Sequence, residues 1–305
     1  MSPGREATVE VDGHRLVLTN LDKVLYPKVG FTKSDLLAYY SAIAPTMLGH
    51  LAERPLSVQR FPDGVEGQRF FGKNLPKGAP DWLQSVVVKS GVRGSHEEVR
   101  YPIVDCAAAL LYFANLAAIE LHVPMWRSDP ARPAPSPDEI VFDLDPGAPA
   151  ALPECCALAL LLREELPELA DRPLEPLPKV SGKKGLQLYC AVEPMEAEAA
   201  RTLAHTVAEG FASRHPDLAV ANMRKDLRGG VVLIDWSQNV PAKTTVAPYS
   251  LRPEPEPSVS APVSWEEVAS ATTPAGAAAL RFGPAQVLAR VEAHGDLFAP
   301  LTARR

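Results

Sequence analysis

The sequence EIVFDLDPG (residues 139–147) decides the fold of this chain. It is mostly apolar up to a Pro-Gly pair, which ends a strand in a turn. Side chains two residues apart in a strand project from the same face, so Asp143 and Asp145 point together while their apolar neighbours face the core. The pattern predicts a buried strand that presents two carboxylates at an end open to substrate.

A third carboxylate, Asp235, ends a second apolar strand, VVLID (residues 231–235). Carboxylate oxygens are preferred ligands of divalent ions such as Mg²⁺ and Mn²⁺. Two such ions about 3.5 to 4 Å apart stabilise the attacking and leaving oxygens of phosphoryl or nucleotidyl transfer together. Asp143, Asp145 and Asp235 are therefore the predicted metal-binding and catalytic residues.

A D-x-D pair at a strand end is not specific to metal sites, because Asp is also common in turns. The pair occurs in phosphatases with a nucleophilic first Asp and in manganese-dependent glycosyltransferases. The phosphatase pattern has Thr or Val two places after the second Asp, where this chain has Gly147. The pair alone leaves these classes open, so the prediction depends on the neighbouring motifs.

A glycine-rich segment, SGKKG (residues 181–185), lies between two apolar runs. Small residues let backbone amides approach phosphate oxygens, Ser181 can donate a hydrogen bond, and Lys184 brings positive charge. The segment lacks the G-x-x-x-x-G-K-[ST] pattern of a P-loop. A glycine hairpin with solvated lysines is the alternative interpretation.

Polar and basic residues are dense beyond Asp235, and loops of this kind commonly carry function. Lys243 and Arg252 suit the triphosphate of a nucleotide. Upstream, Arg224 and Arg228 belong to a basic cluster that can serve a template or a nucleotide. A solvated charged face is the alternative for that cluster.

The composition fits a globular enzyme, because 305 residues with 46% hydrophobic residues can bury a large core. The net charge of -6 argues against extensive nucleic-acid binding, so a DNA contact requires a local basic cleft. The sequence has no apolar run long enough to span a membrane and no apolar N-terminal leader, so we expect a cytoplasmic protein without membrane contact. The four cysteines lack a C-x-x-C spacing, which favours buried thiols over a zinc site or disulfides.

Helical and strand patterns alternate along the chain, which predicts an α/β or α+β fold with two lobes. A proline-rich stretch at 127–138 marks the break between them. We predict a single domain over 1–305, with an N-terminal lobe (1–130), a catalytic sheet lobe (131–260) and a C-terminal helical segment (261–305). Predicted strands and hairpins cover 8–19, 56–61, 139–145, 186–193 and 229–236, and predicted helices cover 32–51, 106–121, 150–170, 196–213 and 275–294.

Several ordered motifs together resemble one family. They are LTNLDKVLYPKVGFTKSD (18–35), RFPDGVEGQRFFGKNLPKGAPDWL (60–83), AIELHVPMWR (118–127), VFDLDPG (141–147), SGKKGLQLY (181–189), DWSQN (235–239), AKTTVAPYSLRP (242–253) and VSAPVSWEEV (259–268). In this order they are similar to the polymerase domain of bacterial ligase D, the primase-polymerase of non-homologous end joining. That family belongs to the archaeo-eukaryotic primase superfamily, which implies a two-lobed primase-like fold with an RNA-recognition-like sheet carrying the catalytic acids.

The resemblance implies roles for individual residues. The three aspartates match a metal-binding triad that holds two ions, usually Mn²⁺ and otherwise Mg²⁺. The residues that match positions around the incoming nucleotide are His122, Ser181, Lys184, Gln187, Lys243 and Arg252. The residues assigned to DNA are Lys23 and Lys33 at a 5'-phosphate, Phe70 and Phe71 near the template, and Arg60, Arg224 and Arg228 as further basic contacts. By sequence alone, core packing also accounts for the histidine and the Phe pair.

The implied activity is template-directed addition of nucleotides, with ribonucleotides preferred, at DNA gaps or broken ends that carry a 5'-phosphate. The implied partners are such DNA, NTPs or dNTPs, the end-binding protein Ku and a separate DNA ligase, and the implied location is the nucleoid. No motif of a ligase or nuclease module follows the polymerase-like region, so we expect a stand-alone polymerase or an excised domain.

Two positions depart from the family pattern. The motif G-L-H-x-Y has Gln187 in place of its histidine, and Gln59 stands where Lys commonly precedes Arg60. Gln donates a hydrogen bond but carries no positive charge, so we expect weaker binding of the triphosphate. A catalytically weakened module that bridges DNA ends and a de novo primase are the alternative functions.

Overall fold

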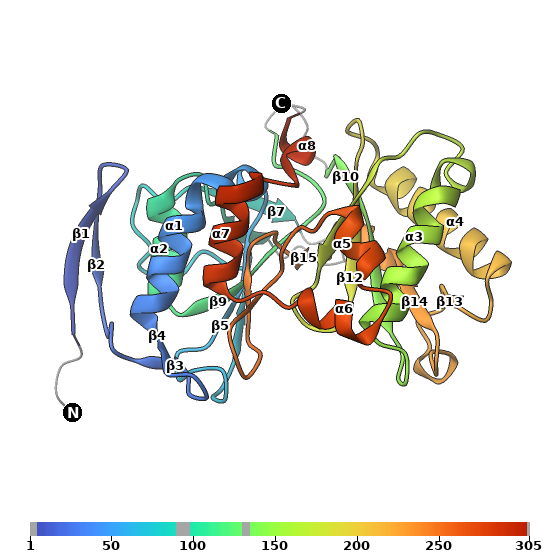
Figure 1. The fold of residues 1–305 in the computed structure, drawn as a ribbon. Helices are drawn as coiled ribbons and strands as arrows, with labels where there is room; N and C mark the ends of the chain where they lie inside the picture. The colour runs from blue at the N-terminus through green and yellow to red at the C-terminus, as the bar shows by residue number, and fades with distance from the viewer. Residues whose placement is uncertain (1–4, 90–97, 130–134, 304–305) are drawn as a thin grey trace. The chain divides into compact units, whose positions relative to one another are not determined.

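The computed structural model describes residues 5–89, 98–129 and 135–303 (Figure 1). The chain divides into two compact units, and each is described by itself below. Unit 1 comprises Met1–Val123, Val246–Val259 and Gly283–Gly295, and unit 2 comprises Pro124–Thr245, Ser260–Phe282 and Asp296–Arg305. The lobes expected from the sequence follow the chain in order, whereas each unit is assembled from three separate segments.

Unit 2 is built on a five-stranded sheet with the strand order β11-β12-β10-β14-β13. The strands are β10 (Glu139–Pro146), β11 (Pro176–Val180), β12 (Leu186–Ala191), β13 (Ala219–Val220) and β14 (Val232–Asp235). Neighbouring strands are antiparallel, except that β13 and β14 are parallel. Helix α3 (Leu152–Leu169) joins β10 to β11, and α4 (Ala197–Arg214) follows β12. This β-α-β-β-α-β order confirms a mixed α/β fold with the kind of sheet that RNA-recognition domains have.

The helices of unit 2 pack against this sheet (Figure 1). The carboxylate of Glu154 accepts a 2.7 Å hydrogen bond from the Ala151 amide, which satisfies a backbone donor at the start of α3. Buried residues of α3 recur at helical spacing: Cys155, Leu158, Ala159, Leu162 and Leu166. Two short helices, α5 (Trp265–Ser270) and α6 (Pro274–Ala279), pack on α3. The apolar stripe of α3 is thereby buried.

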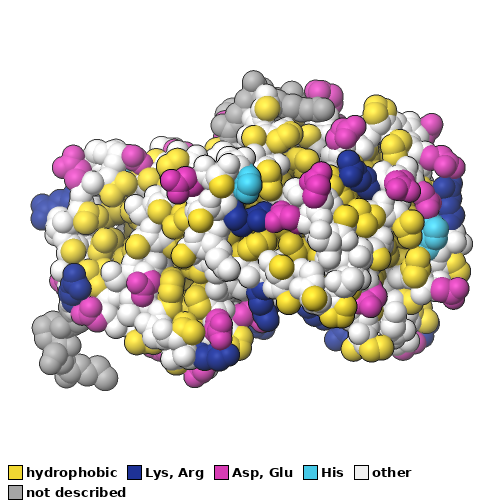
Figure 2. Space-filling view, in the orientation of Figure 1, with side chains coloured by type: hydrophobic (Ala, Val, Ile, Leu, Met, Phe, Trp, Pro, Cys, Tyr) yellow, Lys and Arg dark blue, Asp and Glu magenta, His cyan; other side chains and the backbone are white. Residues whose placement is uncertain are grey.

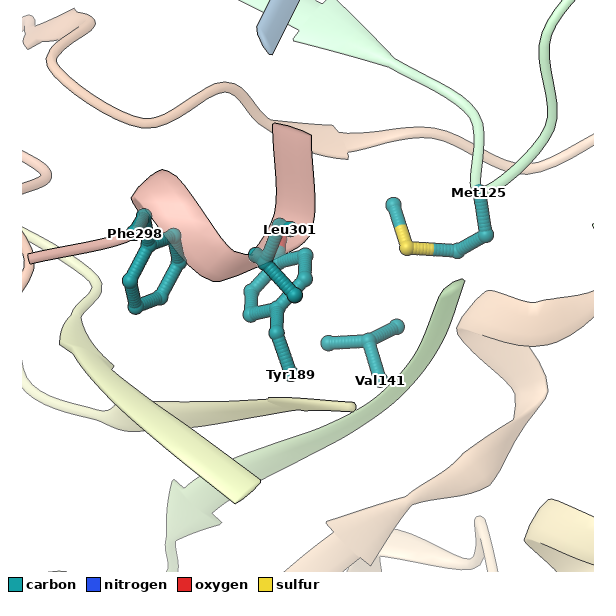
Figure 3. Close-up of a cluster of buried hydrophobic side chains, with 5 residues drawn as sticks. All are labelled: Met125, Val141, Tyr189, Phe298 and Leu301. Carbon is teal, nitrogen blue, oxygen red and sulfur yellow. The ribbon is translucent and has the colours of Figure 1, made fainter. Parts of the chain in front are cut away.

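An apolar cluster packs the last helix, α8 (Ala299–Thr302), against β10 and β12 (Figure 3). Its members are Met125, Val141, Tyr189, Phe298 and Leu301. The ring centroids of Tyr189 and Phe298 lie 5.5 Å apart in a tilted arrangement. Val141 precedes Asp143 by two residues, so the cluster covers the same face of β10 that carries the aspartate further along the strand.

Unit 1 is built on a four-stranded sheet with the order β15-β9-β5-β6. The strands are β5 (Ser57–Arg60), β6 (Phe70–Gly72), β9 (Ala118–Val123) and β15 (Thr245–Val246), of which Val246 lies in this unit. Helix α1 (Lys33–Leu51) packs against α2 (Ala107–Asn115) and α7 (Pro284–His294). A capping box starts α1, because Thr32 and Asp35 each accept a hydrogen bond from the other's backbone amide.

Four two-stranded ribbons complete unit 1. They are β1 (Ala7–Val11) with β2 (His14–Leu18), β3 (Val24–Tyr26) with β4 (Phe31–Thr32), β7 (Ser85–Lys89) with β8 (Glu98–Pro102), and β16 (Leu251–Arg252) with β17 (Ser258–Val259). The strands β16 and β17 come from the segment that returns to this unit late in the chain.

The predicted helix over residues 106–121 is wrong in its second half. Helix α2 ends at Asn115, and Ala117 has a φ of 56°, a conformation through which a right-handed helix cannot continue. The chain then forms β9, which pairs antiparallel with β5. The run is apolar on all sides, and such a pattern fits a buried helix and a buried strand equally well.

Most other predicted elements agree with the structure to within a few residues. The predicted hairpin over 8–19 is formed by β1 and β2, and the predicted helices over 32–51, 150–170 and 196–213 are α1, α3 and α4. The final helical segment is divided, because α6 belongs to unit 2 and α7 to unit 1. Residues 130–134 of the predicted linker lie outside the described residues.

Charged side chains of both signs are interspersed on the face shown in Figure 2. The described residues on this face form no continuous basic band. None of the described helices is long and apolar enough to cross a membrane.

The apolar cluster predicts a large effect of truncating Phe298. Phe298 is fully buried, so Phe298→Ala leaves a cavity and should lower the free energy of unfolding by about 3 to 5 kcal/mol, measured by denaturant titration. Phe71→Ala is the matched control, because that ring is 54% exposed and its removal should change the free energy by less than about 0.5 kcal/mol. Equal effects of the two substitutions would contradict a stabilising role of the cluster.

Candidate active site

The three predicted aspartates lie together on the sheet of unit 2. Antiparallel pairing of β10 with β14 sets Asp143 directly opposite Asp235. Asp145 follows two residues later on β10, so its side chain projects from the same face. Asp235 is buried, and the other two aspartates are half-buried. Strand alternation and register therefore bring Asp143 and Asp145 together with Asp235, which is far from them in the sequence, on one face of the sheet.

Burial and mutual repulsion make Asp143 an unusual carboxyl group. Burial, followed by the charges of Asp145 and Asp235, raises the pKa of Asp143 from its ordinary 3.8 to about 7. A hydrogen bond from Gln187 and the charge of Lys179 oppose this rise in pKa. A bound cation would relieve the same repulsion, so the site favours either protons or metal ions.

Asp235 is held by the turn that it begins. Its Oδ1 accepts hydrogen bonds from the Ser237 backbone amide at 2.9 Å and from the Ser237 hydroxyl at 2.6 Å, and its Oδ2 accepts from the Gln238 side-chain Nε2 at 2.9 Å. The exposed Lys243 donates in turn to the Ser237 hydroxyl. These contacts fix the carboxylate of Asp235 and connect it to the predicted triphosphate ligand Lys243.

The donor set fits hard divalent cations, which take carboxylate oxygens as ligands. Within the described ranges, no three His, Cys, Asp or Glu side chains lie so that they could hold a metal ion together as they stand. Strand register nevertheless sets Asp143 and Asp235 side by side on one face of the sheet, with Asp145 on the same face.

The glycine-rich loop packs closely against the end of β10. A Cβ atom at Gly185 would lie 2.5 Å from the Leu144 carbonyl oxygen, so only glycine fits there. The Ser181 hydroxyl accepts hydrogen bonds from the amides of Lys183, at 3.3 Å, and Gly185, at 3.1 Å. Lys183 and Lys184 are exposed within the loop. The loop therefore offers cations next to the aspartates, while Ser181 holds its shape.

Gln187 differs from the role expected for it. Register aligns Gln187 of β12 with Asp143 on one side and with Lys179 of β11 on the other. Its side chain hydrogen-bonds the Asp143 carboxylate, and its Oε1 accepts a 2.6 Å hydrogen bond from Lys179 Nζ. The residue is buried, so its amide is taken up within the sheet and is not presented as a free phosphate ligand.

The basic residues Arg224 and Arg228 lie in a loop beside the other end of the D-x-D motif. Arg224 is exposed and forms an ion pair with Asp226, whereas Arg228 is half-buried and donates to the Met223 carbonyl. A Cβ atom at Gly147 would meet the Arg228 carbonyl oxygen at 1.7 Å, so this glycine lets the loop approach the strand end. The loop is thus fixed against the turn that ends β10.

Unit 1 contains a second charged group around Glu120. This carboxylate is 1% exposed and lies 2.6 Å from Arg252 Nε and 3.3 Å from His122 Nε2. Residues 120 and 122 lie on one face of β9, and Arg252 comes from β16, which contacts β9. The structure therefore brings His122, predicted in the N-terminal lobe, together with Arg252, predicted in the catalytic sheet lobe, and adds a buried acid between them.

Glu120 and Lys179 were not predicted from the sequence. Each is a charged residue inside an apolar strand, and charged groups are rarely fully buried unless they are paired. For Glu120 the signal was hidden because the segment was interpreted as a helix, which obscured the i, i+2 relation to His122. For Lys179 the partners come from other strands, which local sequence does not show.

The residues assigned to DNA in unit 1 form a cationic group near the start of α1. Lys33 is buried, and its Nζ donates a 2.5 Å hydrogen bond to the Thr19 carbonyl. Burial, with the charges of Lys23 and Arg60, lowers the pKa of Lys33 to about 8. Lys23 is partly exposed and pairs with Asp63 at 2.8 Å. Positive charges held this close together repel one another, so binding of an anion among them is favoured.

The Phe pair is exposed, as a role in base stacking requires. Phe70 and Phe71 are 45% and 54% exposed on β6, which excludes the alternative of core packing. The Phe71 ring lies edge-on to His122 at 6.4 Å between centroids. Lys73 Nζ lies 5.7 Å from the centroid of the same ring. An exposed ring with the Lys73 ammonium group nearby is suited to a nucleic-acid base.

The chain is similar to known proteins over most of its length. The family model for the LigD primase-polymerase domain matches residues 32–298. The chain is 42% identical over 292 residues to the multifunctional non-homologous end joining protein LigD of Mycolicibacterium smegmatis, covering 95% of this chain and 36% of that protein. It is 34% identical over 264 residues to the bifunctional non-homologous end joining protein LigD of Bacillus subtilis, covering 86% of this chain and 41% of that protein.

A solved structure is similar over nearly the whole chain. The polymerase domain of Mycobacterium tuberculosis ligase D, in complex with DNA, matches with a TM-score of 0.86 and 40% identity, covering 95% of this chain and 99% of that one. The chain spans little more than a third of the length of the mycobacterial relative, at 36%. Within that span the three aspartates, the glycine-rich loop and the Glu120 group all fall inside the matched range. The chain therefore belongs to the LigD primase-polymerase domain family, a family of nucleotidyltransferases.

Proposed function

We propose that this chain is a template-directed nucleotidyltransferase that extends a primer 3'-hydroxyl at gaps or broken ends of DNA during end joining or gap repair. The in-register pair of Asp143 and Asp235, with Asp145 on the same face, carries the proposal. The DNA complex of the solved mycobacterial domain and the end-joining names of the relatives support it.

The three aspartates would hold two divalent cations, Mn²⁺ in preference to Mg²⁺. Bound there, such cations stabilise the attacking and leaving oxygens and the charge on the reacting phosphate. Asp143 and Asp145 contribute negative charge from one strand, and Asp235 contributes it from the next. Ser237 and Gln238 keep the Asp235 carboxylate in one orientation through their hydrogen bonds.

Each unit has side chains that suit a nucleotide. Ser181, Lys184 and Lys243 of unit 2 suit the triphosphate, because exposed ammonium groups form charge-assisted hydrogen bonds with phosphate oxygens. His122 and Arg252 of unit 1 are oriented by the buried Glu120 and would serve as further ligands of the nucleotide. The preferred substrates would be ribonucleotides.

The DNA end would be bound by unit 1. Lys23 and Lys33 would pair with the 5'-phosphate, and Phe70 and Phe71 would stack on template bases for about 1 to 3 kcal/mol per base. Arg60 adds positive charge near Lys33. Arg224 and Arg228 of unit 2 would contact the nucleic acid backbone. Ku and a separate ligase complete the proposed partners, with the nucleoid as the place of action.

Two other functions give different outcomes in the same assay. A catalytically weakened DNA-end bridging module binds 5'-phosphorylated ends but extends no primer. A de novo primase synthesises a product on a single-stranded template without a primer. Primer extension on a gapped, 5'-phosphorylated duplex, with and without the primer, separates these functions from the proposed one.

Asp143→Ala should reduce primer extension by more than about a thousandfold, because a lost metal ligand removes several kcal/mol of transition-state stabilisation. DNA binding, measured by fluorescence anisotropy, should stay within about twofold, since the phosphate contacts are elsewhere. Asp217→Ala, at an exposed aspartate of the same unit, is the control and should extend at the wild-type rate. Full activity of Asp143→Ala would refute the assignment of the active site.

The raised pKa of Asp143 predicts two opposite effects of pH. Protons compete with the cation, so Mn²⁺ affinity measured by calorimetry should fall about tenfold per pH unit below about 7. Without metal, the folded state binds this proton more tightly than the unfolded state, so the free energy of unfolding should decrease as the pH rises through 7. Asp143→Asn should flatten this pH dependence of stability. A wild-type stability that does not change between pH 6 and 8 would contradict the assignment.

The lowered pKa of Lys33 predicts that recognition of the 5'-phosphate weakens in alkali. The Lys33 ammonium loses its proton as the pH rises past about 8, so the preference for 5'-phosphorylated over 5'-hydroxyl DNA should decline between pH 7 and 9.5. The midpoint should lie above 8, because a bound phosphate favours the charged form. Lys33→Met should lose most of the preference, and Lys28→Met, at an exposed lysine of the same segment, should keep it. A wild-type preference that is constant to pH 9.5 would rule out this role for Lys33.

A further inference from the structure

Four polar side chains form one row across the sheet of unit 2. Strand register aligns Lys179 of β11 with Gln187 of β12, Gln187 with Asp143 of β10, and Asp143 with Asp235 of β14. Residues that are directly opposite in neighbouring strands project from the same face. The row therefore leads from a cation to two of the three proposed metal ligands by way of one uncharged amide.

Hydrogen-bond chemistry fixes the orientation of that amide. An ammonium group has donors and no acceptor, so the group that faces Lys179 Nζ at 2.6 Å must be the Gln187 oxygen. The Gln187 NH₂ group then faces the opposite way, toward the Asp143 carboxylate to which it is hydrogen-bonded. If the amide were reversed, the Gln187 NH₂ group would face the Lys179 ammonium, which is also a donor. The Gln187 oxygen would then face the Asp143 carboxylate, which is also an acceptor.

Lys179 is itself held rigidly. Its side chain is fully buried, and its Nζ also donates to the Ser260 hydroxyl at 2.6 Å and lies 5.4 Å from the centroid of the Tyr189 ring. Ser260 donates to the Val180 carbonyl at 3.0 Å. Desolvation of a buried charge is strongly unfavourable, so an apolar residue of the same size would fill a packing role with less loss of stability.

We propose that Lys179, acting through the Gln187 amide, is a positioning residue that holds the Asp143 carboxylate in its metal-binding orientation. The proposal rests on the proposed function, because it takes Asp143 as a metal ligand. Groups hydrogen-bonded to a metal-binding carboxylate commonly change metal affinity by about 10- to 100-fold when they are removed. In this chain the Gln187 amide therefore orients a metal ligand. Its place at the family's histidine position had instead predicted a contact with the nucleotide phosphate.

Removing Lys179 has two effects of opposite sign on a bound cation. Loss of a nearby positive charge favours the cation, whereas loss of the amide orientation disfavours it. A single variant mixes the two effects, and a double-mutant cycle separates them. Lys179→Met in the Gln187→Met background reports the charge effect alone, because no amide remains to be oriented.

The experiment measures Mn²⁺ affinity by isothermal titration calorimetry for the full chain and its variants Lys179→Met, Gln187→Met and Lys179→Met/Gln187→Met. We expect Gln187→Met to weaken Mn²⁺ binding by about tenfold or more. The change in Mn²⁺ affinity that Lys179→Met causes should be about tenfold less favourable in the wild-type background than in the Gln187→Met background. If Lys179→Met changes the affinity by the same factor in both backgrounds, the lysine does not act through the amide and the proposal fails.

Asp143→Asn distinguishes this proposal from the proposed function. Wild-type Mn²⁺ affinity in Asp143→Asn would overturn the metal site itself. Weakened binding in Asp143→Asn together with an uncoupled cycle would overturn only the positioning role. Thermal melts of every variant show whether each is folded at the assay temperature.

A second test uses only the wild-type protein, so its result does not depend on whether a variant folds. Selective ¹⁵N labelling of glutamine side chains should give a Gln187 NH₂ signal that exchanges slowly with water and shifts when Mg²⁺ is added. Slow exchange is expected because the amide is buried and hydrogen-bonded. Fast exchange, or a signal that Mg²⁺ leaves unchanged, would contradict the connection between Gln187 and the metal site.

Discussion

The antiparallel register of β10 between β12 and β14 is the constraint on which the rest of the site depends. It sets Asp143 opposite Asp235, so two like charges are neighbours by backbone geometry and not by side-chain choice. Like charges directly opposite in a sheet are destabilising. The positive charge of Lys179 partly compensates for this repulsion. On the other side, the hydrogen bond from Ser237 holds the Asp235 carboxylate in place. The site is thus an unfavourable arrangement of charge supported by its neighbours.

The sheet supports these charges with apolar packing along the same face. Val141 and Tyr189 belong to the cluster around Phe298. On their strands they are neighbours of Asp143 and Gln187, respectively, on the same face. The raised pKa of the Asp143 carboxyl corresponds to an unfavourable ionised state on the order of a few kcal/mol. Burial of large aromatic and aliphatic side chains is of the same order, about 1.5 to 3 kcal/mol each. Stability gained in the cluster therefore offsets stability lost at the carboxylates.

The sequence revealed what depends on local pattern. Alternation in EIVFDLDPG was sufficient to place Asp143 and Asp145 on one face, and the helix predicted over 32–51 corresponds to α1. Pairing between strands was not visible, so Lys179 beside Gln187 and the ion pair of Glu120 with the distant Arg252 came only from the structure. The error at residues 106–121 has the same origin, because pairing with β5, and not propensity, makes that stretch a strand. Roles carried by the family resemblance, such as those at the DNA end, stay predictions.

The three-segment composition of each unit has a consequence for anyone who wishes to divide the molecule. A cut after Val123 would leave unit 1 without β16, β17 and α7, which return to it from later in the chain. Neither unit can be expressed as one uninterrupted piece of the natural sequence. Separate production would require circular permutation or new linkers that join the segments in a different order. The same interleaving delays completion of unit 1 on the ribosome until α7 has emerged, long after most of unit 2 has been synthesised.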